Sequence, residues 1–133
     1  MVSPHPLRKA IEARDPEGII AALHPEVSFN TPLIDVPVRG REQVLRLFAV
    51  LATVFEDFQF VDELAGDGTH AFVFRLRVDG HPIQGVDYLQ LDEEGLVRHF
   101  TVSMRPFTSV RALARRMAEP LAELLPEASD QLR

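Results

Sequence analysis

The sequence predicts a single α+β domain, because its hydrophobic periodicity changes along the chain and then changes back. Apolar residues recur at helical spacing up to Phe55, alternate with polar residues from Phe58 to Arg105, and return to helical spacing after Pro106. Short turn sequences separate the alternating segments, which is typical of strands joined by hairpins. We therefore expect helices packed on an antiparallel sheet, followed by one more helix.

Two short helices are expected first. One follows Ser3-Pro4, and the next begins at Asp15-Pro16, an N-cap residue followed by a proline at the first helical position. His24-Pro25 ends the second helix, and a short strand from Val27 to Thr31 follows. The segment from Pro32 to Gly40 holds two prolines and an aspartate, which predicts a loop.

The longest predicted helix runs from about Arg41 to Phe55, where apolar residues recur at steps of three and four. Four strands follow, and turn sequences that contain glycine separate them. In the first of these strands, alternation places Phe58, Phe60, Asp62 and Leu64 on one face. The four predicted strands lie at Phe58–Leu64, around Phe72–Arg77, at Ile83–Leu91 and at Leu96–Arg105.

The C-terminal region is predicted to be helical and interrupted. Val110, Leu113 and Met117 recur at helical spacing, and Pro120 is expected to break the helix. The last residues, Ala128 to Arg133, are expected to form a frayed tail.

Composition excludes several classes of protein. The 133 residues carry 14 Lys and Arg against 20 Asp and Glu, a net charge of −6, so no basic surface for nucleic acid or anionic membranes is expected. The chain has no cysteine, and its histidines lack metal-ligand spacing, so we expect neither a metal nor a cofactor. No apolar run could span a membrane and Met1–Arg14 has no signal-peptide core, so we expect a cytoplasmic protein with one domain over residues 1–133.

Three segments of the chain are distinctive: the helix and strand from Asp15 to Val27, Phe29-Asn30-Thr31-Pro32 before the long helix, and the strand and turn from Gly85 to Gly95. In this order they resemble the nuclear transport factor 2-like superfamily, which includes ketosteroid isomerases, SnoaL-like polyketide cyclases and limonene epoxide hydrolases. The resemblance covers about Leu7 to Arg105. It implies a cystatin-like topology, in which a curved antiparallel sheet forms a cone against the N-terminal helices, with an extra C-terminal helix in this chain.

The resemblance also implies a blind, mainly apolar pocket inside the cone that binds a small hydrophobic molecule. The other face of the sheet commonly forms a homodimer in this superfamily, and here it would carry Arg75, Arg77, Tyr88 and His99. The residues expected to line the pocket are Phe29, Thr31, Phe72, Phe74, Leu76, Leu89, Phe100, Val102 and Met104.

Asp87 is the strongest candidate for a catalytic residue. Alternation places it between Gly85 and Leu89 on the apolar face, where burial should raise the pKa of its carboxyl group. It could then donate a hydrogen bond as a neutral acid or act as a general base, and it could also be a structural residue bonded to a backbone amide. Its position matches the oxyanion-donor aspartate of ketosteroid isomerases, which stays protonated at neutral pH.

The rest of the isomerase pattern is missing. Thr31 stands where the resemblance would place the general-base aspartate, and Leu7 stands near the oxyanion tyrosine, so a standard steroid isomerase is not expected. The epoxide hydrolase pattern needs an arginine where Gly85 stands. Asp35, in an apolar loop that could cover the cone, is a weaker candidate for the missing base, and a turn-stabilising role is the alternative.

Two classes of function therefore remain open. The chain could be an enzyme that catalyses isomerase- or cyclase-like proton transfer through Asp87, without a metal. It could instead be a non-catalytic ligand-binding or dimerisation module, with a pocket filled by its own side chains. The volume of the cone distinguishes a filled pocket from an open one.

Overall fold

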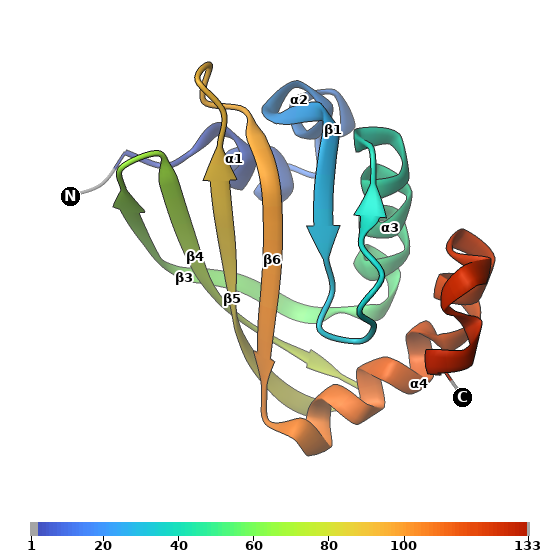
Figure 1. Ribbon diagram of the computed structural model, residues 1–133. Coiled ribbons are helices and arrows are strands. Elements are labelled where there is room, and N and C mark those ends of the chain that lie inside the picture. Colours follow the sequence, from blue (N-terminus) through green and yellow to red (C-terminus); the bar gives the residue numbers. More distant parts are fainter. Residues whose placement is uncertain (1–2, 133) are drawn as a thin grey trace.

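The computed structural model describes residues 3–132 and confirms the α+β class (Figure 1). The helices form where helical spacing predicts them, and the strands form where the period is two. In chain order the elements are α1 (Pro6–Glu12), α2 (Pro16–Ala22), β1 (Leu23–Asn30), β2 (Val38–Arg39), α3 (Arg41–Val54), β3 (Glu56–Gly66), β4 (Thr69–Val78), β5 (His81–Leu91), β6 (Val97–Arg105), α4 (Phe107–Leu124) and the 3₁₀ helix η1 (Pro126–Leu132).

The strands form one six-stranded sheet in the order β2-β1-β6-β5-β4-β3. Neighbours from β3 to β6 are antiparallel, as hairpin connections require. In contrast, β1 runs parallel to β6, so the sheet is mixed. This pairing joins segments on either side of α3 and four strands, and it brings Phe29 beside Phe100.

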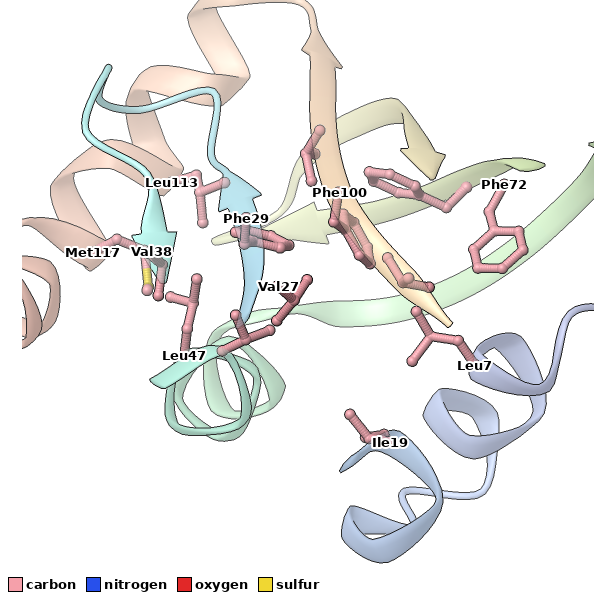
Figure 2. Close-up of a cluster of buried hydrophobic side chains, with 14 of the residues drawn as sticks. Leu7, Ile19, Val27, Phe29, Val38, Leu47, Phe72, Phe100, Leu113 and Met117 are labelled. Atoms are coloured by element: carbon pink, nitrogen blue, oxygen red, sulfur yellow. The ribbon is translucent and has the colours of Figure 1, made fainter. Parts of the chain in front are cut away.

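The helices cover the concave side of the sheet at different places. In Figure 1, α1 and α2 lie near one end of the long strands, and α4 leaves the other end of β6 and runs beside α3. Figure 2 shows the same two ends of the core, with Leu7 of α1 beside Phe72, and Met117 of α4 near Val38 and Leu47. The space between these two ends is the inside of the cone.

The alternation predicted for β3 is wrong beyond Phe60. The pairing of β3 with β4 shifts register between Phe60 and Asp62, a bulge that reverses the faces of the following residues. Leu64, predicted on the apolar face, is 53% exposed, whereas the side chain of Glu63 is only 4% exposed. The sheet therefore buries an acid where the pattern predicted a leucine.

The predictions for the C-terminal region also need correction. The helix continues through Pro120, which has no N–H to bond to the carbonyl of Arg116 one turn earlier. Ala128 is fully buried within η1, so the described part of the predicted frayed tail, up to Leu132, is ordered as a 3₁₀ helix. Arg133 lies outside the described residues, as do Met1 and Val2 of the segment considered for a signal peptide.

The predicted loop after Thr31 also contains β2, which pairs with β1.

Candidate functional site

A cavity of about 1070 Å³ lies inside the cone. Its wall is formed by the inner face of the sheet, by one side of α3, by residues of α1, α2 and the loop after β1, and by three α4 residues, Leu113, Met117 and Leu121. Ligand pockets are typically about 300–1,000 Å³, so the cavity has room for a drug-sized molecule. The phenylalanines of the cone therefore leave an open space.

Aromatic rings make up much of the wall. Phe100 contacts Phe29 and Phe48, with ring centroids 4.7 and 5.9 Å apart. On the other side, Phe58 and Phe74 stack with their centroids 5.6 Å apart. These rings come from four strands of the sheet, β1, β6, β4 and the edge strand β3, and from α3, so the cavity presents apolar surface from several directions.

Most of the residues predicted to line the pocket lie on the cavity wall. Three of them instead lie in the packed core, because neighbouring elements cover that part of the concave face. Phe72, for example, contacts the rings of Phe60 and His5, with ring centroids 5.3 and 6.5 Å away. On the wall are Phe29, Thr31, Phe74, Asp87, Phe100, Val102 and Met104, and in the core are Phe72, Leu76 and Leu89.

Asp87 is 6% exposed and lines the cavity. It lies mid-strand on β5, between Phe72 on β4 and Val102 on β6, so apolar residues flank it on both sides. Within residues 3–132 no group forms a hydrogen bond or ion pair with its carboxyl group, and no fully buried side-chain oxygen there lacks a partner. The carboxyl oxygens therefore keep their remaining exposure toward the cavity.

Burial raises the pKa of Asp87 well above its ordinary value of 3.8. The cause is desolvation, since removal from water disfavours the charged carboxylate. A neutral carboxyl group carries an O–H donor, which a carboxylate lacks. In its neutral form the side chain can therefore donate a hydrogen bond into the cavity.

Gly85 shapes the wall next to Asp87. It pairs with Phe74 across β4 and β5, and the phenyl ring lies over the glycine. A Cβ atom at Gly85 would stand 2.7 and 2.8 Å from two ring carbons of Phe74, closer than atoms can pack. The absence of a side chain at this position therefore lets the ring occupy its place on the wall.

Thr31 is the second polar residue inside the cone. It follows the last residue of β1, and its Oγ1 accepts a hydrogen bond of 2.8 Å from the backbone N–H of Leu33. This bond holds the hydroxyl group in a fixed position while it lines the cavity. Glu12, Arg14, Asp57 and Gln59 also line the cavity but are exposed, so the other polar side chains lie at the rim.

The fold does not place Asp35 in the cavity with Asp87. Its side chain is exposed and is not part of the cavity wall, although Pro32 and Leu33 of the same loop are. The backbone N–H of Asp35 donates a 2.8 Å hydrogen bond to the side chain of Gln131 in η1. This contact fastens the loop to the C-terminal segment.

Sequence reasoning missed a polar cluster at the α1 end of the sheet, which we call the Glu63 cluster: His5, Arg8, Glu63 and His70. The Glu63 carboxylate accepts from the His5 backbone N–H at 2.8 Å, His70 Nδ1 at 2.9 Å and an Arg8 nitrogen at 3.3 Å. The adjacent pair Asp62-Glu63 could have indicated this cluster, because two successive acids in a regular strand cannot both face solvent and one of them must then have a partner.

Among residues 3–132, no three His, Asp or Glu side chains are grouped as metal ligands would be. Within the same residues no helix is both long enough and apolar enough to cross a membrane.

Comparison with known proteins identifies relatives of the fold. A family model described as the SnoaL-like domain matches residues 7–111. A steroid delta-isomerase from Pseudomonas aeruginosa is 32% identical, with a TM-score of 0.79 over 90% of this chain and 88% of that one. An uncharacterised protein with a cystatin-like fold from Silicibacter pomeroyi is 26% identical, with a TM-score of 0.81 over 92% of this chain and 91% of that one.

A more distant structure shares the fold alone. It is a protein with a ketosteroid isomerase-like fold from Catenulispora acidiphila, in complex with trimethylamine. It is 13% identical, with a TM-score of 0.61 over 79% of this chain and 85% of that one. A search of curated proteins found no significant match.

Proposed function

The chain belongs to the SnoaL-like domain family, and from that premise we propose that it binds a small apolar carbonyl compound inside its cone. In this proposal Asp87 donates a hydrogen bond to the carbonyl oxygen. The observation that supports it most directly is a buried acid that has no partner among residues 3–132 and lines a cavity rich in phenylalanines. The size of the cavity favours this function over the alternative in which side chains fill the pocket.

The hydrogen bond gives the site its chemical character. An apolar wall binds the hydrocarbon part of a ligand, and a neutral carboxyl donor would otherwise stay unsatisfied in that surrounding. A bond from Asp87 polarises the carbonyl group and stabilises negative charge on its oxygen, as the enolisation step of an isomerase or cyclase requires. The named steroid isomerase among the relatives supports a carbonyl compound as the ligand.

Binding of a matched pair of probes tests the proposal. Naphthalene with one acetyl group should bind more tightly than naphthalene with one isopropyl group, by about three- to tenfold, because a neutral hydrogen bond contributes about 0.5–1.5 kcal/mol. Isothermal titration calorimetry measures both affinities. Asp87→Leu should abolish the preference for the ketone, whereas Asp67→Asn, at an exposed turn, should leave it unchanged.

Two outcomes would contradict the proposal. Equal affinity for the ketone and the hydrocarbon would mean that Asp87 donates nothing to the ligand. A preference for trimethylammonium at neutral pH, lost in Asp87→Leu, would mean that the carboxyl group is ionised and selects cations. The amine is a sharp comparison because a structure of this fold was obtained with trimethylamine.

We also propose that the outer face of the sheet forms a homodimer. Val61, Val86 and Tyr88 are exposed on it at 51%, 38% and 44%, which is apolar surface that a second copy could cover. Native mass spectrometry of the purified chain should show a dimer, and Tyr88→Glu should shift it toward monomer. Glu94→Lys, in the exposed turn between β5 and β6, is the control, and a wild-type monomer at micromolar concentration contradicts the proposal.

A further inference from the structure

Thr31 presents a second hydrogen-bond donor to the cavity. Its oxygen already accepts the Leu33 N–H, and within residues 3–132 nothing accepts its hydroxyl proton. A threonine hydroxyl has one proton to donate, so this proton is available to a bound molecule. Since the 2.8 Å bond to Leu33 fixes the oxygen, the donor is held in place before any ligand binds.

The register of the sheet places this donor relative to Asp87. Phe29 and Asn30 of β1 pair with Phe100 and Thr101 of β6, so Thr31 follows in line with Val102. Val102 pairs in turn with Asp87 on β5. Thr31 and Asp87 therefore lie two strands apart in one row, which corresponds to roughly 9.5 Å between their backbones.

The two groups share the concave face. Phe29 and Val102 both line the cavity, and alternation places Thr31 on the same side as Phe29. Val102, the residue between the two donors, is apolar. The row thus presents a donor, an apolar strip and a second donor to the same cavity.

We propose that the cavity selects apolar molecules with two hydrogen-bond acceptors, such as dicarbonyl compounds, one acceptor bound by Asp87 and the other by Thr31. This inference rests on the proposed function, since it assumes a carbonyl bonded to Asp87. Thr31 is then the residue that determines specificity between ligands with one and with two acceptors. It binds the substrate and takes no part in proton transfer.

Two naphthalene probes test the inference on the full-length protein. One carries an acetyl group at one end, and the other carries an acetyl group at each end. The wild type should bind the diketone about three- to tenfold more tightly than the monoketone, because the second carbonyl gains one neutral hydrogen bond. Thr31→Val should remove this difference, whereas Thr31→Ser, which keeps the hydroxyl, should retain it.

The outcomes separate this inference from the proposed function. If the wild type binds both ketones more tightly than the hydrocarbon but does not prefer the diketone, the inference is overturned and the proposed function stands. The same holds if Thr31→Val keeps the preference. If neither ketone binds better than the hydrocarbon, both fail. Because the comparison of probes on the wild type is decisive by itself, the result does not depend on whether Thr31→Val folds.

Discussion

At the scale of single residues, the burial of Asp87 lowers the stability of the fold, and its carboxyl group gives the cavity wall a polar side chain. A neutral carboxyl group in an apolar surrounding is tolerated, but the charged form is strongly disfavoured. The native state therefore holds the proton of Asp87 more tightly than the unfolded chain does. This difference connects the stability of the protein to pH through one side chain.

Asp87→Asn should make the free energy of unfolding less sensitive to a rise in pH above about 4. Burial raises the pKa of Asp87, so its contribution is fully present below about pH 4 and is lost as pH rises through the raised pKa. The free energy of unfolding of the wild type should therefore fall relative to that of Asp87→Asn between pH 4 and 8. Urea unfolding at several pH values measures the difference in free energy of unfolding between the wild type and Asp87→Asn, with Asp67→Asn as the control. A gap that stays constant with pH would show that Asp87 does not titrate differently on folding.

Gly85→Ala should disturb the cavity wall as well as the strand. The new methyl group would meet the ring of Phe74, which must move toward the cavity, at an expected cost of about 1–3 kcal/mol. Urea unfolding gives the cost, and affinity for the acetylnaphthalene probe reports the change in the wall. Phe74→Leu combined with Gly85→Ala should cost less than the sum of the two single changes, because the smaller side chain makes room. Full additivity would contradict this account.

At the scale of elements, the bulge in β3 decides how α1 is attached. The bulge turns Glu63 inward, so that its carboxylate accepts hydrogen bonds from three residues. These are His5, which caps α1, Arg8 within α1, and His70 on β4. The side chain of Glu63 is almost fully buried, so these bonds are protected from water. The Glu63 cluster thus fixes a seven-residue helix that is too short to be stable alone.

Glu63→Leu should detach α1 in part. It leaves the His5 N–H and the His70 ring without their acceptor, and unsatisfied buried donors cost about 1–3 kcal/mol each, so we expect a loss of about 2–4 kcal/mol. Urea unfolding measures the loss, and hydrogen exchange should show faster exchange of the α1 amides. Glu94→Leu, at an exposed turn, is the matched control. Equal stability of the two variants would exclude a role for the cluster in holding α1.

The helix α4 extends past the part of the chain that the family model matches and completes the cavity. Its Met117 is fully buried and contributes to the wall near Leu47 and Val38 (Figure 2). The Arg116–Asp79 ion pair, at 2.6 Å, joins the exposed side of the helix to the turn after β4. Packing therefore holds α4 mainly through its inner face, since exposed ion pairs contribute little.

Met117→Ala should loosen α4 and enlarge the cavity. Truncation of a buried methionine costs about 2–5 kcal/mol, and the lower end is expected here because the site already borders open space. Unfolding by urea measures the cost, and weaker binding of the acetylnaphthalene probe should accompany it. Glu119→Ala, on the exposed side of the same helix, should change neither quantity. A destabilisation below about 0.5 kcal/mol would mean that α4 contributes little to the core.

At the scale of the whole molecule, His5 makes the stability of the fold depend on pH. Its Nε2 is 2.9 Å from the carbonyl oxygen of Gly95, and its Nδ1 accepts a hydrogen bond from the backbone N–H of Leu7. A neutral ring with its proton on Nε2 makes both hydrogen bonds. Burial lowers the pKa of His5 below 6.5, and nearby His70 also lowers it, against the opposite effects of Gly95 and Glu63. Protonation of Nδ1 would remove the acceptor for Leu7.

Acidification should therefore destabilise the protein through His5. Because the folded pKa is lowered, the unfolded chain binds the proton more readily, so the stability that is present above pH 6.5 is lost as pH falls through the folded pKa. His5→Asn keeps an N-cap acceptor but does not titrate, so the wild type's advantage over it should shrink between pH 7 and 5. Urea unfolding at these pH values checks this, with the exposed His81→Asn as control. An advantage that grows on acidification would reverse the sign of the argument.

Local patterns were enough to predict much of this protein. The apolar face of α3 and the alternation of β4, β5 and β6 depend on residues close in sequence, and so do the turns between the strands. The same alternation predicted that Asp87 would lie on the buried face, because neighbouring positions on a strand fix which side a residue occupies. The fold class and the buried acid were therefore determined by the sequence alone.

Contacts between distant residues decided the rest. The parallel pairing of β1 with β6 sets Thr31 in line with Asp87, and the bulge in β3 turns Glu63 toward His5, fifty-eight positions away. The open volume of the cone depends on how the sheet, α3 and α4 meet, which no local pattern contains. Periodicity specifies the direction of a side chain within its own element, whereas register, bulges and cavities arise only when separate elements pack against each other.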